Sequence, residues 1–170
     1  MLVAGIGNIF FLDDGFGPAV AVALLARAVT EPLPDGVRVV DYGIRGMHLT
    51  YDLLSGVDAL VLVDALPGND SAERPPGTVT VLEVGPDDIG ESEFDAHGMS
   101  PVAVLASLGS MGATLPATYL VGCVPADVGE GIGLSEPVGA AVDAAVTAVT
   151  DLLSELDPGR LAGATRQRGH

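Results

Sequence analysis

The feature that most constrains the fold is the segment at residues 58–64, Asp-Ala-Leu-Val-Leu-Val-Asp, whose five central residues are all apolar. A run of this length, apolar throughout and closed by a polar residue at each end, is typical of a central parallel strand that is covered on both faces. A strand of this kind needs helices above and below the sheet. The run therefore predicts an α/β fold.

The rest of the chain alternates between strand and helix patterns. We expect the other strands at residues 2–4, 37–41, 78–84 and 118–124, and helices at 17–29, 47–54, 100–111 and from Ser135, as a capping residue, to about 156. Residues 66–77 contain Pro67, Pro75 and Pro76 and leave no room for a crossover helix, so strand 78–84 should be antiparallel to its predecessor or lie at an edge.

This order predicts a three-layer α/β sandwich: a five-stranded, mostly parallel, twisted sheet with one antiparallel strand and helices on both faces. The chain has 170 residues, which is the size of one domain. We expect a single domain over residues 1–156. Residues 157–170, rich in Gly and Arg, should form a flexible C-terminal tail.

The charge excludes several classes of partner. Seven Lys+Arg residues, all of them Arg, stand against 23 Asp+Glu, which gives a formal net charge of −16. Binding of nucleic acid or anionic lipid needs clustered basic residues, and none are present. Without lysine, the chain cannot form a Schiff base or a P-loop of the usual type.

Cysteine and membrane signals are equally sparse. The single cysteine, Cys123, excludes an internal disulfide and a Cys-rich zinc site, and its place in an apolar strand indicates a buried structural thiol. We see no signal-peptide pattern at the N-terminus and no apolar run long enough to span a membrane. We therefore expect a soluble, cytoplasmic protein.

Three side chains are candidates for a site at the carboxyl edge of the predicted sheet, where ligands bind in folds of this type. Asp14 follows the first strand, Asp64 ends the third, and His97 precedes a helix. Two carboxylates and an imidazole can bind a divalent metal and leave coordination positions open. The alternatives are structural: Asp13 or Asp14 as an N-cap or first-turn acid, Asp64 as a turn residue, and His97 as a surface residue.

A family resemblance then becomes decisive. The segment GIGNIFFLDDGFGPAVAVAL resembles the opening of the hydrogenase maturation endopeptidases, which process the large subunit of nickel–iron hydrogenases. The resemblance continues in order through DYGIRGMHLTYDLL, LVLVDAL, HGMSPVAVLASL and LVGCVPADVGEGIGLSEPV. These blocks cover about residues 2–153, nearly the whole expected domain.

The resemblance implies a function and a set of site residues. It implies an endopeptidase that removes a C-terminal extension from the nickel-loaded precursor of the hydrogenase large subunit. Asp14, Asp64 and His97 match the family's metal site, and so are expected to be both metal ligands and catalytic residues. The nickel would be supplied by the precursor. The family's block after the second strand is matched by residues beside that site: Asp41, Gly43, Gly46 and Met47.

Two other classes of function stay open beside the endopeptidase. The first is a non-catalytic nickel-sensing or precursor-binding module of the same fold. The second is a small-molecule hydrolase or phosphorylase, which the acidic charge and the lack of a phosphate-binding loop disfavour. For the chain itself we expect a monomer, because no exposed apolar stripe stands out in the pattern.

Overall fold

A computed structural model describes residues 1–67, 74–89 and 101–157 of the chain. Its five strands are β1 (Leu2–Ile6), β2 (Arg38–Gly43), β3 (Ala59–Ala65), β4 (Val79–Val84) and β5 (Ala117–Cys123). Its α-helices are α1 (Phe16–Arg27), α2 (Gly46–Leu54), α3 (Pro101–Ser110) and α4 (Glu136–Leu156). Two short 3-10 helices, η1 (Leu12–Gly15) and η3 (Pro86–Ile89), complete the described elements. Each predicted strand and helix is confirmed, with ends that move by a few residues.

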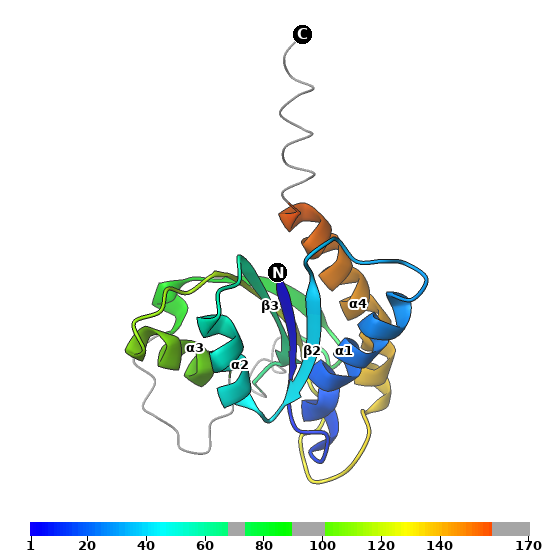
Figure 1. Cartoon of the computed structure of the whole chain (residues 1–170). Helices are drawn as coiled ribbons and strands as arrows, with labels where there is room; N and C mark the ends of the chain where they lie inside the picture. Colours follow the sequence, from blue (N-terminus) through cyan, green and yellow to red (C-terminus); the bar gives the residue numbers. More distant parts are fainter. Residues whose placement is uncertain (68–73, 90–100, 158–170) are drawn as a thin grey trace.

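The strands form one sheet in the order β2-β1-β3-β5-β4 (Figure 1). β1 pairs in parallel with β2 and with β3, and β3 pairs in parallel with β5. β4 lies at the edge, antiparallel to β5. Both halves of the expectation for this strand, its edge position and its antiparallel direction, are therefore confirmed. The apolar run that we placed at the centre, β3, is the middle strand.

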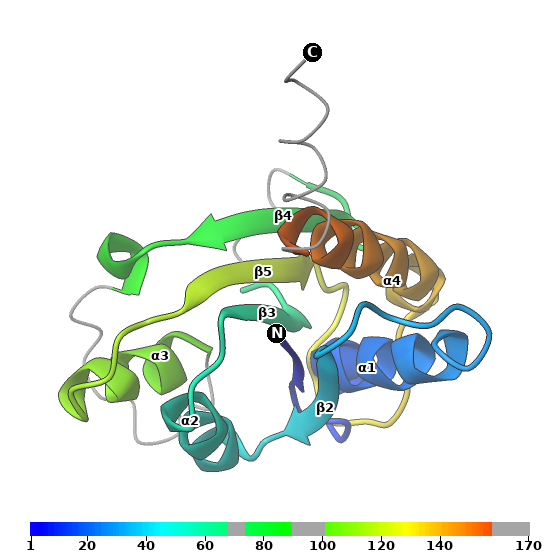
Figure 2. The ribbon, with the colours of Figure 1, turned by 45° about the horizontal axis from the view of Figure 1, so that its top comes forward.

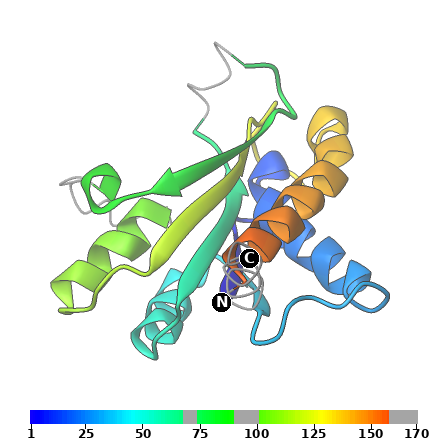
Figure 3. The same cartoon turned by 90° about the horizontal axis from the view of Figure 1, so that it is seen from above.

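Helices cover both faces of the sheet, which confirms the three-layer sandwich. α1 and α4 lie on one face, and α2 and α3 lie on the other (Figures 2 and 3). Alternating residues of β1 explain the division: Val3 belongs to the core under α1 and α4, whereas Leu2 and Ala4 belong to the core under α2 and α3.

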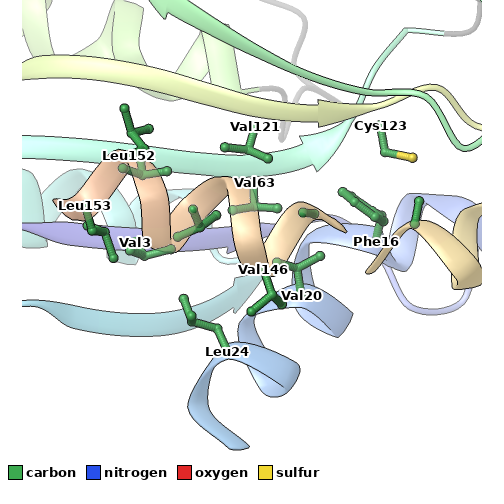
Figure 4. Packing of buried hydrophobic residues seen from close by; sticks show 14 of the residues in the cluster. Val3, Phe16, Val20, Leu24, Val63, Val121, Cys123, Val146, Leu152 and Leu153 are labelled. Carbon is green, nitrogen blue, oxygen red and sulfur yellow. The ribbon is translucent and has the colours of Figure 1, made fainter. Parts of the chain in front are cut away.

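The core under α1 and α4 is built mainly from medium-sized aliphatic side chains, together with the fully buried aromatic ring of Phe16 (Figure 4). α4 is long and apolar enough to span a membrane by length and composition alone. In this structure, however, it packs against the sheet through a buried stripe of Val138, Ala141, Ala145, Val146, Val149, Leu152 and Leu153. α4 is therefore a core helix of this fold.

Two predictions fall on segments that the structure does not describe. His97 and the tail beyond residue 157 both lie outside the described residues. The position of His97 and the flexibility of the tail accordingly stay predictions.

Candidate functional site

Two close approaches of glycine backbone bring helix α1 onto the ends of the central strands. A Cβ on Gly17, in the first turn of α1, would lie 2.1 Å from the carbonyl oxygen of Ile6 and 2.2 Å from that of Val63. A Cβ on Gly5 would lie 2.4 Å from the carbonyl oxygen of Gly17. Only glycine fits at such distances. The start of α1 therefore rests directly on the carboxyl ends of β1 and β3.

Asp14 is held at this edge of the sheet by the loop that leads into α1. Its Oδ2 accepts a 2.7 Å hydrogen bond from the backbone N–H of Asn8, which immediately follows the β1 turn. Gly7 makes the turn possible, because its φ of 134° and its close approach to the Asp14 carbonyl both exclude a side chain. The Asp14 carboxylate is thus fixed in orientation and partly buried.

Asp64 lies on β3, one residue before the end of the strand, and is also partly buried. Its Oδ1 accepts a 2.8 Å hydrogen bond from the N–H of Ala65. Burial raises the pKa of the Asp64 carboxyl well above its usual range, and the negative charge of Asp14 raises it further. The hydrogen bond from Ala65 opposes this rise without cancelling it. The two predicted acids are therefore close enough to repel each other.

A pair of mutually repelling carboxylates has the donor chemistry that a divalent cation requires. Oxygen ligands in a partly buried setting attract a metal ion, and the ion removes the repulsion between them. Among the described residues, no group of three or more His, Cys, Asp and Glu side chains is placed to hold a metal. The third predicted ligand, His97, is outside those residues, so the structure brings together Asp14 and Asp64 alone.

Asp13, beside Asp14, has a different and wholly structural role. It is fully buried, and its carboxylate accepts hydrogen bonds from the N–H groups of Ala126, Asp127 and Ser135 and from the Ser135 hydroxyl. Burial raises the pKa of Asp13, but these hydrogen bonds outweigh it and hold the pKa below its usual value. Asp13 thereby ties η1 to the loop between β5 and α4.

The structure excludes one capping alternative and confirms another capping prediction in position only. The N-cap of α1 is Gly15, which has no side chain to cap with, so neither Asp13 nor Asp14 caps that helix. Ser135 does stand at the N-cap of α4, as predicted, but its side chain makes no capping bond. Its hydroxyl donates to Asp13 instead, because the buried carboxylate is the stronger acceptor.

The block after β2 lies beside this edge, as the resemblance implied. The carbonyl of Gly43 accepts a 3.1 Å hydrogen bond from the N–H of Gly7, which joins the block to the β1 turn. Oδ1 of Asp41 is buried and has no hydrogen-bond partner among the described residues. Arg45 donates through Nε to the carbonyl of Tyr42 at 3.0 Å and also to the carbonyl of Asp41. Arg45 thus stabilises the end of β2.

Asn8 and the structural role of Asp13 were not predicted from the sequence. Asn8 followed the strand in a GxGN pattern, which is a usable signal for a turn that presents a backbone N–H to an acid. The partners of Asp13 are more than a hundred residues away along the chain, and no local pattern connects them.

Comparison with known proteins gives a consistent picture. A family model described as HycI, hydrogenase maturation protease, matches residues 20–152, a range that includes Asp64 and His97 and begins after Asp14. The hydrogenase 2 maturation protease of Escherichia coli K12 is 32% identical over 157 residues, which are 91% of this chain and 91% of that protein. A putative hydrogenase maturation protease of Methanocaldococcus jannaschii is 31% identical over 153 residues, 86% of this chain and 91% of that protein.

Solved structures agree with the sequence relatives. The hydrogenase maturating endopeptidase HybD of E. coli matches with a TM-score of 0.71 at 30% identity, covering 91% of each chain. The hydrogenase 2 maturation peptidase of a Thaumarchaeota archaeon (SCGC_AB-539-E09) matches with a TM-score of 0.66 at 32% identity. That match covers 90% of this chain and 97% of the other.

Proposed function

The chain belongs to the hydrogenase maturation protease family, and from that premise we propose that the Asp14–Asp64 edge of its sheet recognises nickel in the precursor that it cleaves. As a member of this family the protein is an endopeptidase that acts on the large-subunit precursor of a hydrogenase. To this we add three points. The cleaved bond precedes a C-terminal extension, cleavage depends on nickel, and Asp14 and Asp64 are responsible for that dependence.

The observation that supports the proposal is the pair of carboxylates held at one edge, where the charge of Asp14 raises the pKa of Asp64. Each carboxylate keeps one oxygen in a hydrogen bond, Asp14 with the N–H of Asn8 and Asp64 with that of Ala65. These bonds orient the acids before any ligand arrives. Because the charge of Asp14 disfavours the ionised form of Asp64, a nickel ion brought by the precursor would gain binding energy from relieving that repulsion.

In the proposed reaction the acids position the metal-bearing part of the precursor and help the attack of water. Nickel, as a Lewis acid, can polarise the scissile carbonyl and lower the pKa of a bound water. Asp14 and Asp64 would contribute oxygen ligands, and His97 the imidazole that the family resemblance implies. A carboxylate oxygen outside the coordination would accept the proton of the attacking water. The close packing of Gly17 on the carbonyls of Ile6 and Val63 would help to hold the two acids near each other.

We also propose an oligomeric state and a cellular location for the protein. We expect it to act as a monomer in the cytoplasm, where the nickel-loaded precursor is available. Removal of the extension would then make maturation irreversible, since the peptide bond is not reformed.

The experiment compares two forms of one substrate. The protein is incubated with the large-subunit precursor of its host hydrogenase, either loaded with nickel or metal-free, and mass spectrometry records the loss of a C-terminal peptide. We expect loss only from the nickel-loaded form. Equal cleavage of both forms would refute nickel recognition. A stable complex that releases no peptide would instead support the non-catalytic binding module.

The same assay tests the site residues. Asp14→Asn, Asp64→Asn and His97→Ala should each abolish processing while circular dichroism stays native, and Asp58→Asn, an exposed acid just before β3, serves as the matched control. Full activity in all three site variants would remove the proposed site.

A further inference from the structure

Large apolar side chains are exposed on the loop that leads to Asp14 and on a second loop that is hydrogen-bonded to it. Ile9, Phe10 and Phe11 are 51%, 59% and 39% exposed, and Ile132 is 77% exposed. The first three precede η1 and Asp14, and Ile132 belongs to the loop between β5 and α4. Exposed aromatic and aliphatic side chains that gather in one place mark interaction surfaces more often than isolated ones do.

Backbone hydrogen bonds hold these two loops side by side. The N–H of Gly131 donates to the carbonyl of Phe10 at 2.9 Å, and the N–H of Leu12 donates to the carbonyl of Gly131 at 3.1 Å. Phe11 and Gly131 form an isolated parallel bridge. In Figure 1 the loop before α1 and the loop before α4 lie together at the end of the molecule opposite the N-terminus. The two loops are therefore neighbours, and we call their exposed apolar residues Ile9, Phe10, Phe11 and Ile132 the apolar rim.

Hydrogen bonds connect the apolar rim to the candidate site and anchor the loop that carries it. Asn8 links the two, because its N–H donates to Asp14 while its Oδ1 accepts a 3.0 Å hydrogen bond from the N–H of Phe10. Leu12 has a φ of 41°, in the left-handed region that non-glycine residues adopt only under constraint. The buried Asp13 next to it fixes the loop to Ala126, Asp127 and Ser135. These stabilising contacts therefore hold the loop in a conformation that leaves apolar side chains exposed next to Asp14.

The negative charge around the apolar rim indicates which kind of partner binds there. Asp127 and Glu130 are exposed on the same loop as Ile132, and the whole chain has a formal net charge of −16. A second copy of the chain would bring the same negative charge to this surface and be repelled. A polypeptide with apolar residues flanked by basic ones would be attracted by the acids and would bury the rim.

We propose that the apolar rim binds a segment of the precursor that combines apolar side chains with flanking Lys or Arg and lies next to the scissile bond. This inference rests on the proposed function, since the rim includes the loop that carries Asp14, where the precursor would be cut. It assigns precursor binding to residues that are separate from the acid pair. The rim would act in the ground state and in the transition state alike, and so affect KM more than kcat.

The test uses Phe10→Ser, Ile132→Ser and the double variant, with Val29→Ser as a matched control. Val29 is also an exposed apolar residue, at 82%, but it follows the C-terminal end of α1. It therefore lies about 18 Å along a 12-residue helix from the site. With nickel-loaded precursor as substrate, we expect the double variant to raise KM at least about tenfold while kcat changes less than about twofold. Val29→Ser should leave both unchanged. An unchanged KM in the double variant overturns the proposal.

Charge is tested separately with Glu130→Lys, and Glu31→Lys, an exposed acid just beyond α1, is its control. Glu130→Lys should raise KM several-fold at low salt, and the difference should shrink at high salt because exposed charges are screened. Equal effects of the two substitutions would show that only net charge matters and would overturn the role of flanking basic residues.

A binding measurement keeps this inference distinct from the proposed function. Calorimetric titration of the intact protein with the precursor reports association whether or not cleavage follows. Binding by the wild type that is lost in the double variant supports the rim even if no peptide is released. Equal binding by wild type and double variant overturns it, and so does a wild-type dimer that the substitutions convert to monomers.

Discussion

Oδ1 of Asp13 accepts a 2.7 Å hydrogen bond from the backbone N–H of Ser135, which lies 122 residues further along the chain. With the other three donors to this carboxylate, the contact joins the loop before α1 to the start of α4. Asp14, the next residue, is one of the two acids of the candidate site. The orientation of that acid and the stability of the fold therefore depend on the same short loop.

Replacement of Asp13 should destabilise the protein strongly. Asp13→Asn removes a fully buried charge and turns one acceptor into a donor that faces backbone N–H groups. We expect the free energy of unfolding to fall by about 3 kcal/mol, since buried donors lose their partners. Denaturant titration at pH 7 measures this, with Asp151→Asn, an exposed acid on α4, as the control.

The same variant should change how stability depends on pH. The pKa of Asp13 is lower in the folded state than in the unfolded state. Its stabilising contribution is therefore complete above the unfolded pKa, near pH 4, and is lost as the pH falls through the folded pKa. The difference in the free energy of unfolding between wild type and Asp13→Asn should be constant from pH 5 to 7 and should shrink below about pH 4. A gap that widens in acid would contradict the assigned hydrogen bonds.

Asp64→Asn should have opposite effects on activity and on stability. Burial and the nearby Asp14 raise the pKa of Asp64 in the folded state. Its carboxylate therefore destabilises the fold increasingly as the pH rises above the unfolded pKa. The neutral amide removes this penalty, so Tm without added metal should rise at pH 7 and match wild type near pH 4, while processing is lost. Asp58→Asn should change neither processing nor Tm. A lower Tm at pH 7 for Asp64→Asn would show that the ionised Asp64 carboxylate does not destabilise the fold.

Gly17→Ala tests the contact that brings the acids together. The added Cβ would lie 2.1 Å from the Ile6 carbonyl oxygen and 2.2 Å from that of Val63, so α1 would have to move away from the strands. We expect a loss of about 3 kcal/mol in the free energy of unfolding, together with loss of processing. Gly109→Ala in α3 is the control. Its Cβ meets nothing within 4 Å, so it should stabilise the helix by about 0.5–1 kcal/mol.

The fold could be predicted because its signals are local and agree with one another. The continuous apolar run in β3 required cover on both faces, and the prolines between β3 and β4 left no room for a crossover helix. The ends of the elements were less certain. β1 continues to Ile6, past the glycine at which the apolar pattern seemed to stop, because Gly5 still pairs with its neighbours in the sheet.

The site was predictable only in part, because it depends on contacts between distant segments. Asp14 and Asp64 stood out as acids that follow apolar strands, and the structure places them together. The apolar rim was not predicted, because the sequence shows that Phe10 and Phe11 are bulky and apolar but not that their side chains are exposed. The role of Asp13 depends on donors in the loop before α4, and single-sequence patterns carry no information about such pairs.

The thiol of Cys123 should be inert, which separates this enzyme from cysteine proteases. The side chain is fully buried on β5, and burial, with a contribution from the charge of Asp13, raises its pKa to about 11. At pH 8 only about one thiol in a thousand would be the reactive thiolate. Iodoacetamide should therefore leave processing intact in the folded protein and label Cys123 once guanidinium unfolds it. Cys123→Ala should keep processing and lower the free energy of unfolding by about 1 kcal/mol through the small cavity that it leaves. Rapid labelling of the folded protein, with parallel loss of processing, would make Cys123 a participant in the reaction.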